Sequence, residues 1–500
     1  MKIVILGGGT AGWLAALMVN KMQPQHSITV IESSEIGIVG AGEGSTGTLS
    51  DIIRNTYWDF GCDEAEFFRE TNATPKLGIH HIDWKVKGHS YLAPIDGAEK
   101  GVFGTYPSLM HALSNDHPFH TTTKNGYLLD KNLSPFYFNN NGEIVSDGLY
   151  AAHFDAHLVG KYFKKKCYNV QAIDAKVVDA LVDTNGFVKN VALDSGQIVE
   201  ADFFIDASGF SRVLHKKLNV GWISYSKYLP VNTAMPFILP YEENHIIMPV
   251  TTAFAQKNGW VWMIPTQERM GCGYVFDSRY TSNEDAQKEI ENVFGREITP
   301  IRFLNFDTGR SEELWKNNCL FIGLSAAFAE PLEATSIHST IVQMHYFILN
   351  NLKNDVATTC NQGSIRSYNA LLGKLYDGFR DFLSVHYSGK RTDSEFWLDI
   401  TKPEKRTDRA LRLLESAKDR SIMDNDLDMM FGFAGSSIWN WILAGLDHLP
   451  KETAIKELKQ YDQEVLGSNQ YHDHIKNMEE TAKSYINNTN FVSWLRDKKI

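Results

Sequence analysis

The sequence contains few cysteines, and none of them has the spacing of a metal ligand. The cysteines are scattered along the chain, their number is odd, and no two are separated by just two residues. A zinc site needs ligands at short spacings, and a disulfide framework needs paired cysteines. We therefore predict neither a disulfide framework nor a metal site. The cysteines are Cys62, Cys167, Cys272, Cys319 and Cys360.

Long apolar runs and an excess of positive charge are also missing. No uninterrupted apolar segment approaches the roughly 20 residues of a membrane-spanning helix. The first apolar run, residues 3–6, ends in glycines, unlike a signal peptide. The net charge of −11 argues against nucleic acid as a partner. We predict a cytoplasmic protein that binds neither membrane nor nucleic acid, with Lys164-Lys165-Lys166 as a solvated helix end.

The composition is that of a globular protein with a large core. The chain has 500 residues, of which 43% are hydrophobic and 22% charged, and it shows no low-complexity linker and no repeat. This length suits two or three domains, or one large elaborated domain. A homo-oligomer is compatible with the sequence, which does not indicate an oligomeric state.

The first residues predict a dinucleotide-binding unit. KIVIL is typical of a buried strand, TAGWLAALMVNKM of a helix, and ITVIESS (28–34) of a second strand. Between them, Gly7, Gly9 and Gly12 form G-x-G-x-x-G. The first glycine permits a tight turn, the second lets the backbone approach a pyrophosphate, and the third packs helix on strand. Glu32, at the end of the second strand, is placed to accept a hydrogen bond from a ribose hydroxyl.

Two further glycine turns favour FAD over NAD. GAGEGST (40–46) follows the second strand, and a late strand ends in Asp206-Ala207-Ser208-Gly209. Such a late turn is typical of two-domain flavoproteins, in which a substrate-facing sheet interrupts the nucleotide domain. The cofactor-binding residues that we predict are Gly7, Gly9, Thr10, Ala11, Gly12, Glu32, Gly42, Glu43, Ser45, Asp206, Gly209, Gly323 and Ile337.

These patterns predict an α/β fold: a doubly wound FAD-binding domain with an inserted mixed β-sheet and an α-rich C-terminal region. Residues 170–206 alternate short strands and turns, and apolar residues take a helical spacing from about residue 335. Strand-like runs are expected at 245–255, 259–264 and 271–277. We expect a FAD-binding domain over 1–340, with insertions at about 80–150 and 215–320, and a helical substrate-binding region over 341–500.

EPLEATSIHST (330–340) predicts a helix that begins just after Glu333. The amides of Thr335 and Ser336 would then lie at its N-terminus, where unpaired N–H groups bind anions. The simpler alternative is that Glu333 or Thr335 only caps the helix.

NATPKLGIHHIDWK (72–85) contains Lys76 just after a proline. A single lysine is usually a solvated charge. His80 and His81 are adjacent, so their side chains should lie on opposite faces of a strand. We assign this pair no function.

Four motifs together resemble the flavin-dependent tryptophan halogenase family. They occur in the order GGGTAGW (7–13), Lys76 in NATPKLGIHHIDW, W-x-W-x-I-P at Trp260, Trp262, Ile264 and Pro265, and EPLEATSI (330–337). The resemblance extends from the first residues to at least residue 446. The W-x-W-x-I-P motif is the most diagnostic, because it separates halogenases from related flavin hydroxylases.

The resemblance implies a reaction and a role for each motif. A separate NAD(P)H-dependent reductase supplies FADH2, which with O2 and halide yields hypohalous acid. Lys76 then holds the electrophilic halogen against a small aromatic substrate, and Glu333 accepts the ring proton. The amides of Thr335 and Ser336 match the halide site of the family. Trp260, Trp262, Ile264 and Pro265 match the wall that keeps the organic substrate from the flavin.

The sequence departs from the family in two places. Ala334 and Ser336 stand where the family pattern PLESTG has serine and glycine, which leaves open the preference among chloride, bromide and iodide. The tryptophan-clamping residues find no match, so another indole, a pyrrole or a phenol is as suitable a substrate as tryptophan. We expect Ser436, Ser437 and Trp439 to line that region. One alternative is a flavin-dependent aromatic monooxygenase. The related hydroxylases carry Gly-Asp at the stretch that aligns with residues 323–324, whereas here Leu324 follows Gly323, which disfavours this alternative. The other alternative is an inactive FAD-binding homologue.

Overall fold

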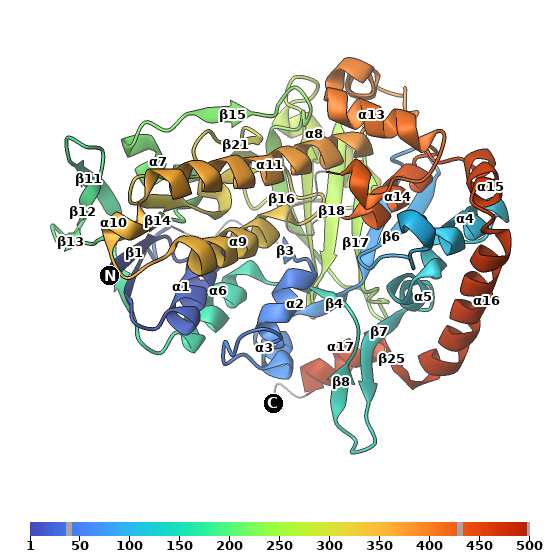
Figure 1. The fold of residues 1–500 in the computed structure, drawn as a ribbon, viewed down its shortest axis with the longest axis horizontal. Helices are drawn as coiled ribbons and strands as arrows, with labels where there is room; N and C mark the ends of the chain where they lie inside the picture. Colours follow the sequence, from blue (N-terminus) through green and yellow to red (C-terminus); the bar gives the residue numbers. More distant parts are fainter. Residues whose placement is uncertain (37–42, 428–433, 498–500) are drawn as a thin grey trace. The chain divides into compact units, whose positions relative to one another are not determined.

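The structure is a computed structural model that describes residues 1–36, 43–427 and 434–497 (Figure 1). The chain forms two compact units, each assembled from three separate stretches. Unit 1 comprises Met1–Asn72, Phe154–Ser226 and Phe306–Phe379. Unit 2 comprises Ala73–His153, Lys227–Asn305 and Arg380–Ile500.

Unit 1 is built on a six-stranded sheet in the order β10-β2-β1-β14-β23-β22. All neighbouring strands are parallel except β22, which pairs antiparallel with β23. Helix α1 packs against both α6 and α9. The predicted strand–turn–helix–strand opening and the α/β class are therefore confirmed. The elements are β1 (Lys2–Leu6), α1 (Thr10–Met22), β2 (Ser27–Glu32), α6 (Ala156–Lys166), β10 (Val170–Asp174), β14 (Phe203–Asp206), β22 (Trp315–Lys316), β23 (Cys319–Phe321) and α9 (Thr335–Tyr346).

Unit 1 also contains two small sheets, four short helices, the short strand β3 (Glu43–Gly44) and residues 362–379 of α11 (Gln362–His386). The antiparallel meander β11-β12-β13 accounts for the short strands expected before residue 206. The second sheet has the order β15-β21-β24. The bounds are α2 (Gly47–Ile53), α3 (Glu64–Glu70), β11 (Val177–Val182), β12 (Val188–Leu193), β13 (Ile198–Glu200), α7 (Val213–Lys217), β15 (Trp222–Ser224), β21 (Gly309–Ser311), β24 (Ala327–Phe328) and α10 (Val356–Thr359).

Unit 2 is built on a mixed seven-stranded sheet in the order β20-β16-β19-β18-β17-β5-β6. The pair β17–β5 is parallel and the other pairs are antiparallel. One face of β16, β18 and β19 forms an apolar core with α8. The predicted mixed sheet is confirmed. Its strands are β5 (Gly78–Ile82), β6 (Ser90–Pro94), β16 (Thr233–Pro240), β17 (Val250–Ala255), β18 (Gly259–Pro265), β19 (Arg269–Phe276) and β20 (Leu304–Asn305), and α8 is Asn283–Phe294.

Helices dominate the last stretch of unit 2, as the spacing of apolar residues predicts. Helix α11 (Gln362–His386) contributes residues 380–386 to this unit. The other helices are α4 (Pro107–Ser114), α5 (Lys124–Asp130), α12 (Glu395–Ile400), α13 (Asp408–Ala417), α14 (Ser436–Gly445), α15 (Lys451–Gln460), α16 (Glu464–Thr481) and α17 (Asn488–Asp497). The short strands are β4 (Thr74–Lys76), β7 (Leu133–Phe138), β8 (Ile144–Ser146), β9 (Ala151–Phe154) and β25 (Tyr485–Asn487). None of the described helices combines the length and apolar character needed to cross a bilayer.

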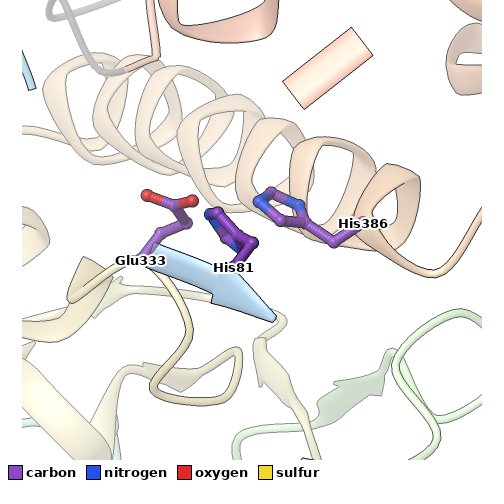
Figure 2. Close-up of side chains that lie close together, drawn as sticks. All are labelled: His81, Glu333 and His386. Carbon is purple, nitrogen blue, oxygen red and sulfur yellow. The ribbon is translucent and has the colours of Figure 1, made fainter. Parts of the chain in front are cut away.

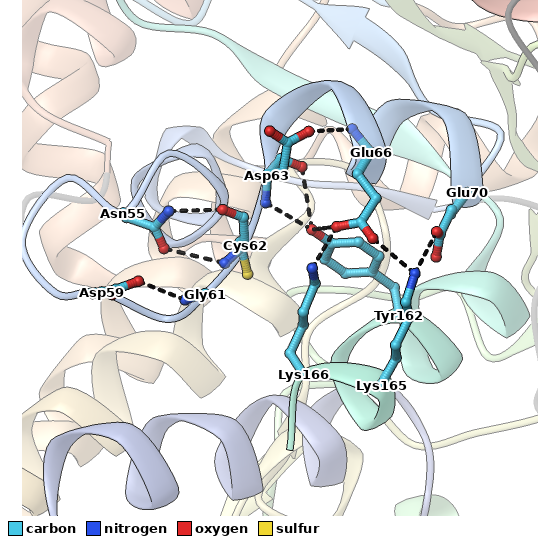
Figure 3. A network of polar contacts seen from close by, with 10 residues as sticks. All are labelled: Asn55, Asp59, Gly61, Cys62, Asp63, Glu66, Glu70, Tyr162, Lys165 and Lys166. Carbon is cyan, nitrogen blue, oxygen red and sulfur yellow. Dashed lines mark hydrogen bonds and ion pairs between the residues drawn. The ribbon is translucent and has the colours of Figure 1, made fainter. Parts of the chain in front are cut away.

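The lysine run at the end of α6 departs from the predicted solvated end. Lys165 is exposed and donates to Glu66 and Glu70 over 2.7 and 2.6 Å, whereas Lys166 is only 7% exposed and also pairs with Glu66 (Figure 3). Successive helical residues are turned by about 100°, so the third lysine faces inward. Burial raises the pKa of Glu66, but hydrogen bonds from Lys165 and Lys166 lower it to about 2. This cluster pairs α6 with α3.

Candidate functional site

The glycine turn after β1 has the shape of a pyrophosphate cradle. Gly7 has φ +110, and a Cβ there would lie 2.2 Å from the oxygen of Ala207. A Cβ on Gly12 would lie 1.9 Å from the oxygen of Gly7. No atom lies within 4 Å of a Cβ on Gly9, the N-cap of α1, which has no side-chain cap. The backbone at the start of α1 is therefore open to an anion, and these residues fit the phosphates of FAD.

Glu32 lies against this turn. A Cβ on Gly8 would be 2.1 Å from its Oε2, and the same oxygen accepts a hydrogen bond of 2.9 Å from Trp13 Nε1. Lys164 Nζ pairs with Oε1 at 2.5 Å. The carboxylate is thus held at the end of β2, beside the glycine turn, where a ribose would lie in a dinucleotide complex.

Asp206 is fully buried, and its carboxylate is occupied by the chain itself. Oδ1 accepts from the amide and hydroxyl of Ser208, at 2.9 and 2.6 Å, and from Ser325 Oγ at 3.1 Å. Oδ2 accepts from the amides of Leu214 and His215, at 2.8 and 3.1 Å. The carboxylate therefore holds the turn that contains Gly209 and the start of α7. Asp206 can therefore contribute to cofactor binding only by holding this turn in place.

The other predicted cofactor residues surround the start of α1 or follow β2. A Cβ on Gly323 would lie 2.9 Å from the Cβ of Ala11, so this glycine permits a close approach to α1. Ile337 is buried in α9, and Ser45 is buried in the second glycine loop. Burial, and then the charge of Asp155, raises the pKa of Glu43 to about 7. Gly42 lies outside the described residues.

Helix α9 begins at Thr335, and its N-cap is Ala334, which has φ 54 and ψ 37. The N-cap position is taken by Ala334, which makes no side-chain cap hydrogen bond, and not by Glu333 or Thr335. Ser336 lies inside the first turn, where a helical φ suits any residue. The left-handed position is therefore Ala334. The Thr335 and Ser336 amides lie at the positive end of the helix dipole.

His338 anchors this helix N-terminus within unit 1. Its Nδ1 is 3.1 Å from Thr46 Oγ1 and 3.3 Å from Thr48 Oγ1, which lie at the start of α2. Burial lowers the pKa of His338 to about 3. The neutral ring therefore joins α9 to the segment that follows the second glycine loop.

Lys76 ends β4 in unit 2 and is only 3% exposed. The strand is tied to the W-x-W-x-I-P strand, because Thr74 Oγ1 donates to the oxygen of Pro265 over 2.6 Å. Gln267 Nε2 also donates to the oxygen of Ala73 over 2.8 Å. The solvated-charge interpretation of Lys76 is thus wrong. A buried ammonium carries a desolvation cost that surface lysines avoid, which singles it out as a functional candidate.

Trp260 and Trp262 alternate along β18 and share one face of the sheet. Val261 faces the opposite way, into the core with α8. The indole of Trp262 lies across Gly273 of β19, where a Cβ would be 2.0 Å from its Cη2. On the other side its strand neighbour is Ala253. Small residues on both flanking strands therefore make room for a flat tryptophan, and Ile264 follows on the same face.

His81 lies in the same row of the sheet, since Ala253 pairs with both Trp262 and His81. It is 0% exposed and stacks on Tyr91, with ring centroids 4.7 Å apart. His386, at the end of α11, has its ring centroid 5.3 Å away; Figure 2 draws both histidines, together with Glu333 of unit 1. Neither nitrogen of His81 has a hydrogen-bond partner among the described residues. Burial, and then the charge of His386, holds the pKa of His81 well below 6.5, so the ring is neutral.

This histidine pair was missed by the sequence reasoning, which assigned the adjacent histidines no function. The expected split between faces is confirmed, because His81 is buried whereas His80 is partly exposed. His386 comes from a helix that lies far along the chain. No local pattern links the two.

The C-terminal residues expected to line the substrate region have structural partners. Ser436 Oγ donates to Asp424 Oδ1 over 2.6 Å, and Ser437 Oγ accepts from the amide of Ala98 over 2.8 Å. The buried ring of Trp439 lies 5.0 Å from that of Phe382. Both hydroxyls thus help to hold the start of α14, which leaves Trp439 as the better candidate for substrate contact.

Comparison with known proteins extends over nearly the whole chain. The family model described as tryptophan halogenase matches residues 2–460. The 7-chloro-L-tryptophan 6-halogenase KtzR of Kutzneria sp. (strain 744) is 32% identical over 434 residues, which cover 80% of this chain and 82% of that protein. The tryptophan 7-halogenase RebH of Lentzea aerocolonigenes is 29% identical over 496 residues, 90% of each chain.

Solved structures of tryptophan halogenases are similar to this chain over almost its full length. Tar14, a tryptophan C-6 flavin-dependent halogenase from taromycin biosynthesis, has a TM-score of 0.88 at 28% identity and covers 99% of both chains. The tryptophan 6-halogenase SttH from Streptomyces toxytricini has a TM-score of 0.87 at 27% identity and covers 98% of this chain and 99% of its own.

Proposed function

Because this chain belongs to the tryptophan halogenase family, we propose that it is a flavin-dependent halogenase acting on an electron-rich aromatic ring. When bound, FADH2 supplies the electrons with which O2, halide and a proton yield hypohalous acid and water. The observation that carries the proposal is the burial of Lys76 beside the W-x-W-x-I-P strand. A buried lysine on a strand that is hydrogen-bonded to the W-x-W-x-I-P strand suits the transfer of a small neutral oxidant, and gives no evident benefit to a passive flavoprotein.

Lys76 holds the electrophilic halogen in one of two ways. As an ammonium it donates a hydrogen bond to the hypohalous oxygen and polarises the O–halogen bond. As a neutral amine it attacks the halogen; an N–halogen bond forms, the O–halogen bond breaks, and water leaves with the amine proton. In either case the ring carbon then takes the halogen, and its proton must be removed.

Glu333 is the residue that we assign to that proton. A carboxylate stabilises the positive ring intermediate and accepts the proton that restores aromaticity. Its place directly before Ala334, at the N-terminus of α9, supports this assignment. The Thr335 and Ser336 amides at the start of α9 are the proposed halide ligands.

Trp260 and Trp262 form the proposed wall between flavin and organic substrate. Trp260 is almost fully buried, and the ring centroids of the pair are 6.5 Å apart. Large side chains with few rotamers exclude a substrate at little cost in conformational entropy. Ile264 and Pro265 extend the same strand, and Pro265 connects it to the Lys76 segment.

The substrate class proposed is an indole, with pyrroles and phenols as alternatives. The printed names of the relatives specify tryptophan for those proteins. The electrons are proposed to come from a separate NAD(P)H-dependent flavin reductase.

The test combines a product screen with matched variants. Purified protein receives FAD, NADH, a flavin reductase, air, one halide and a panel of indoles and phenols, and products are identified by mass. Halogenated product should be lost in Lys76→Ala, while FADH2 oxidation continues. Lys87→Ala, at an exposed lysine of the same unit, should keep full activity.

Glu333→Gln should lower the rate by about 100-fold or more, with FAD affinity unchanged. Glu313→Gln, a surface position paired with Lys316, is its control. A mass gain of one oxygen without halogen would identify a monooxygenase instead. Full halogenation by Lys76→Ala would remove this lysine from the mechanism.

A further inference from the structure

Arg406, between α12 and α13 in unit 2, is a buried cation without a counter-ion among the described residues. The side chain is 4% exposed. Its Nη1 donates to the oxygen of the preceding residue, Lys405, over 2.8 Å. Nε and Nη2 are buried and have no hydrogen-bond partner in the part of the chain that the structure describes. Burial lowers the pKa of Arg406 to about 9, so the group is charged at neutral pH.

The unpartnered edge is the one that other arginines of this protein use to bind carboxylates. Arg391, only 2% exposed, donates from Nε and Nη2 to the two oxygens of Asp393, at 2.8 and 2.7 Å. In unit 1, Arg310 donates from the same two nitrogens to Asp377, at 3.1 Å each. This edge presents two parallel N–H donors, a geometry that favours one anion bound by both.

The neighbouring carboxylate does not serve Arg406. Asp381 is buried and accepts from Arg380 Nε and Nη2, at 2.9 and 2.8 Å. It also accepts from Thr407 Oγ1 at 3.0 Å, although Thr407 follows Arg406 directly. The groups that act on Arg406 or respond to its charge are the Tyr387 phenol and the His448 imidazole. Neither carries a negative charge at neutral pH.

An uncompensated buried guanidinium is strongly destabilising, so such groups are paired in stable proteins. We propose that the Nε/Nη2 edge of Arg406 binds a small monovalent anion, with halide as the expected occupant. A small, easily desolvated anion suits this edge, because the guanidinium is buried and lies within electrostatic reach of the Tyr387 phenol. The residues just before it, 402–404, are exposed, so this surface turn is the route by which a small ion reaches the edge. The site is separate from the Thr335 and Ser336 amides and does not rest on the proposed halogenase activity.

The test measures thermal unfolding of the full chain as sodium bromide replaces sodium gluconate at constant ionic strength. Gluconate is a larger and more strongly hydrated anion than bromide, so it serves as the reference. The wild-type midpoint should rise by about 1–2 °C when bromide reaches ten times its dissociation constant. Arg406→Met should show no such rise. In gluconate it should be at least as stable as wild type, because an apolar side chain of similar length removes the unpaired charge.

Arg412→Met is the matched control, since Arg412 lies on the exposed side of α13. It should keep the wild-type bromide response. Parallel bromide curves for wild type and Arg406→Met would overturn the proposal. Anomalous diffraction from wild-type crystals in bromide gives a second measurement that needs no variant. A bromide peak at the Nε/Nη2 edge is expected, and its absence with bromide bound elsewhere would also overturn the proposal.

Discussion

At the scale of single residues, this protein buries polar groups that lower the stability of the fold. His81 has two nitrogens without partners in the described structure and no exposed surface. Each such group destabilises the fold by about 1–3 kcal/mol. Trp262 depends on the absence of a side chain at Gly273, because its indole fills the space that a Cβ at this position would occupy.

Replacing His81 by Phe tests the cost of the buried imidazole. Its pKa lies well below 6.5 in the folded protein. Below pH 6.5 the imidazole of His81 binds a proton in the unfolded chain but not in the folded one. The free energy of unfolding therefore falls as the pH drops, by up to about 1.4 kcal/mol per pH unit. His81→Phe should match or exceed wild-type stability at pH 7.5 and lose less on acidification. Urea unfolding at pH 7.5, 6.5 and 5.5 measures this. A parallel loss in both proteins would show that His81 does not titrate on unfolding.

Gly273→Ala tests the fit of Trp262. The added Cβ would lie 2.0 Å from the indole, so the ring must move, at a cost of about 1–3 kcal/mol in unfolding free energy. Trp262→Phe should relieve the strain, so the double variant should be more stable than the sum of the single changes predicts. Chemical denaturation of all four proteins gives the coupling. Additive effects would mean that Trp262 does not occupy this space.

At the scale of elements, the start of α9 shows how a departure from a family pattern is accommodated. Positive φ falls on Ala334, whereas Ser336 lies within the helix. Serine at position 336 therefore needs no left-handed backbone, because the positive φ falls two positions earlier in the chain.

Two glycine substitutions should thus have opposite effects. Ala334→Gly removes a left-handed alanine and should stabilise by about 1 kcal/mol. Ser336→Gly matches the family pattern but adds flexibility to a helix interior, and should destabilise by about 0.5–1 kcal/mol. Thermal unfolding of the two variants side by side decides this. The same sign for both would reject the assigned N-cap.

Elements were predictable where the signal is local. The glycine turn after β1, the strand β18 and the helix after Glu333 follow from spacing and turn chemistry over a few residues. Contacts between distant segments could not be predicted from local patterns. The ring of His386 packs near that of His81, and Glu66 pairs with the buried Lys166. No local pattern indicates that Arg406 is buried. The second glycine loop was predicted to bind cofactor, but Gly42 lies outside the described residues. The catalytic assignments of Lys76 and Glu333 stay predictions.

At the scale of the whole molecule, buried histidines should make the fold acid-sensitive at mild pH. Burial holds the pKa of His153 well below 6.5, and lowers those of His215 and His338 to about 4 and about 3. Each loses stability as pH falls below 6.5. Glu43, with its pKa raised to about 7, acts oppositely, because the folded state binds its proton first.

Asp96, whose pKa burial raises to about 6, also opposes the histidines, as do Asp51, Glu289 and Glu457, whose pKa values are raised by burial. The buried histidines with lowered pKa outnumber these carboxyl groups, so the midpoint of thermal unfolding should fall steadily from pH 6.5 to 5. Most carboxylates of the unfolded chain still carry their charge in that range. Differential scanning calorimetry across the range measures it. A flat profile would mean that other carboxyl groups balance the histidines.

The parallel pair β17–β5 has a consequence for synthesis. The chain leaves the unit 2 sheet after β6 and contributes residues 154–226 to unit 1 before β16 and β17 are made. During translation β5 must wait for a neighbour more than a hundred and fifty residues downstream, and pairings this remote form slowly. Unit 1 in turn is complete only when Phe379 has emerged. No single cut yields a self-sufficient half, so a nascent or truncated chain exposes apolar strand faces in both units, and its yield will depend on chaperones more than on the stability of the finished fold.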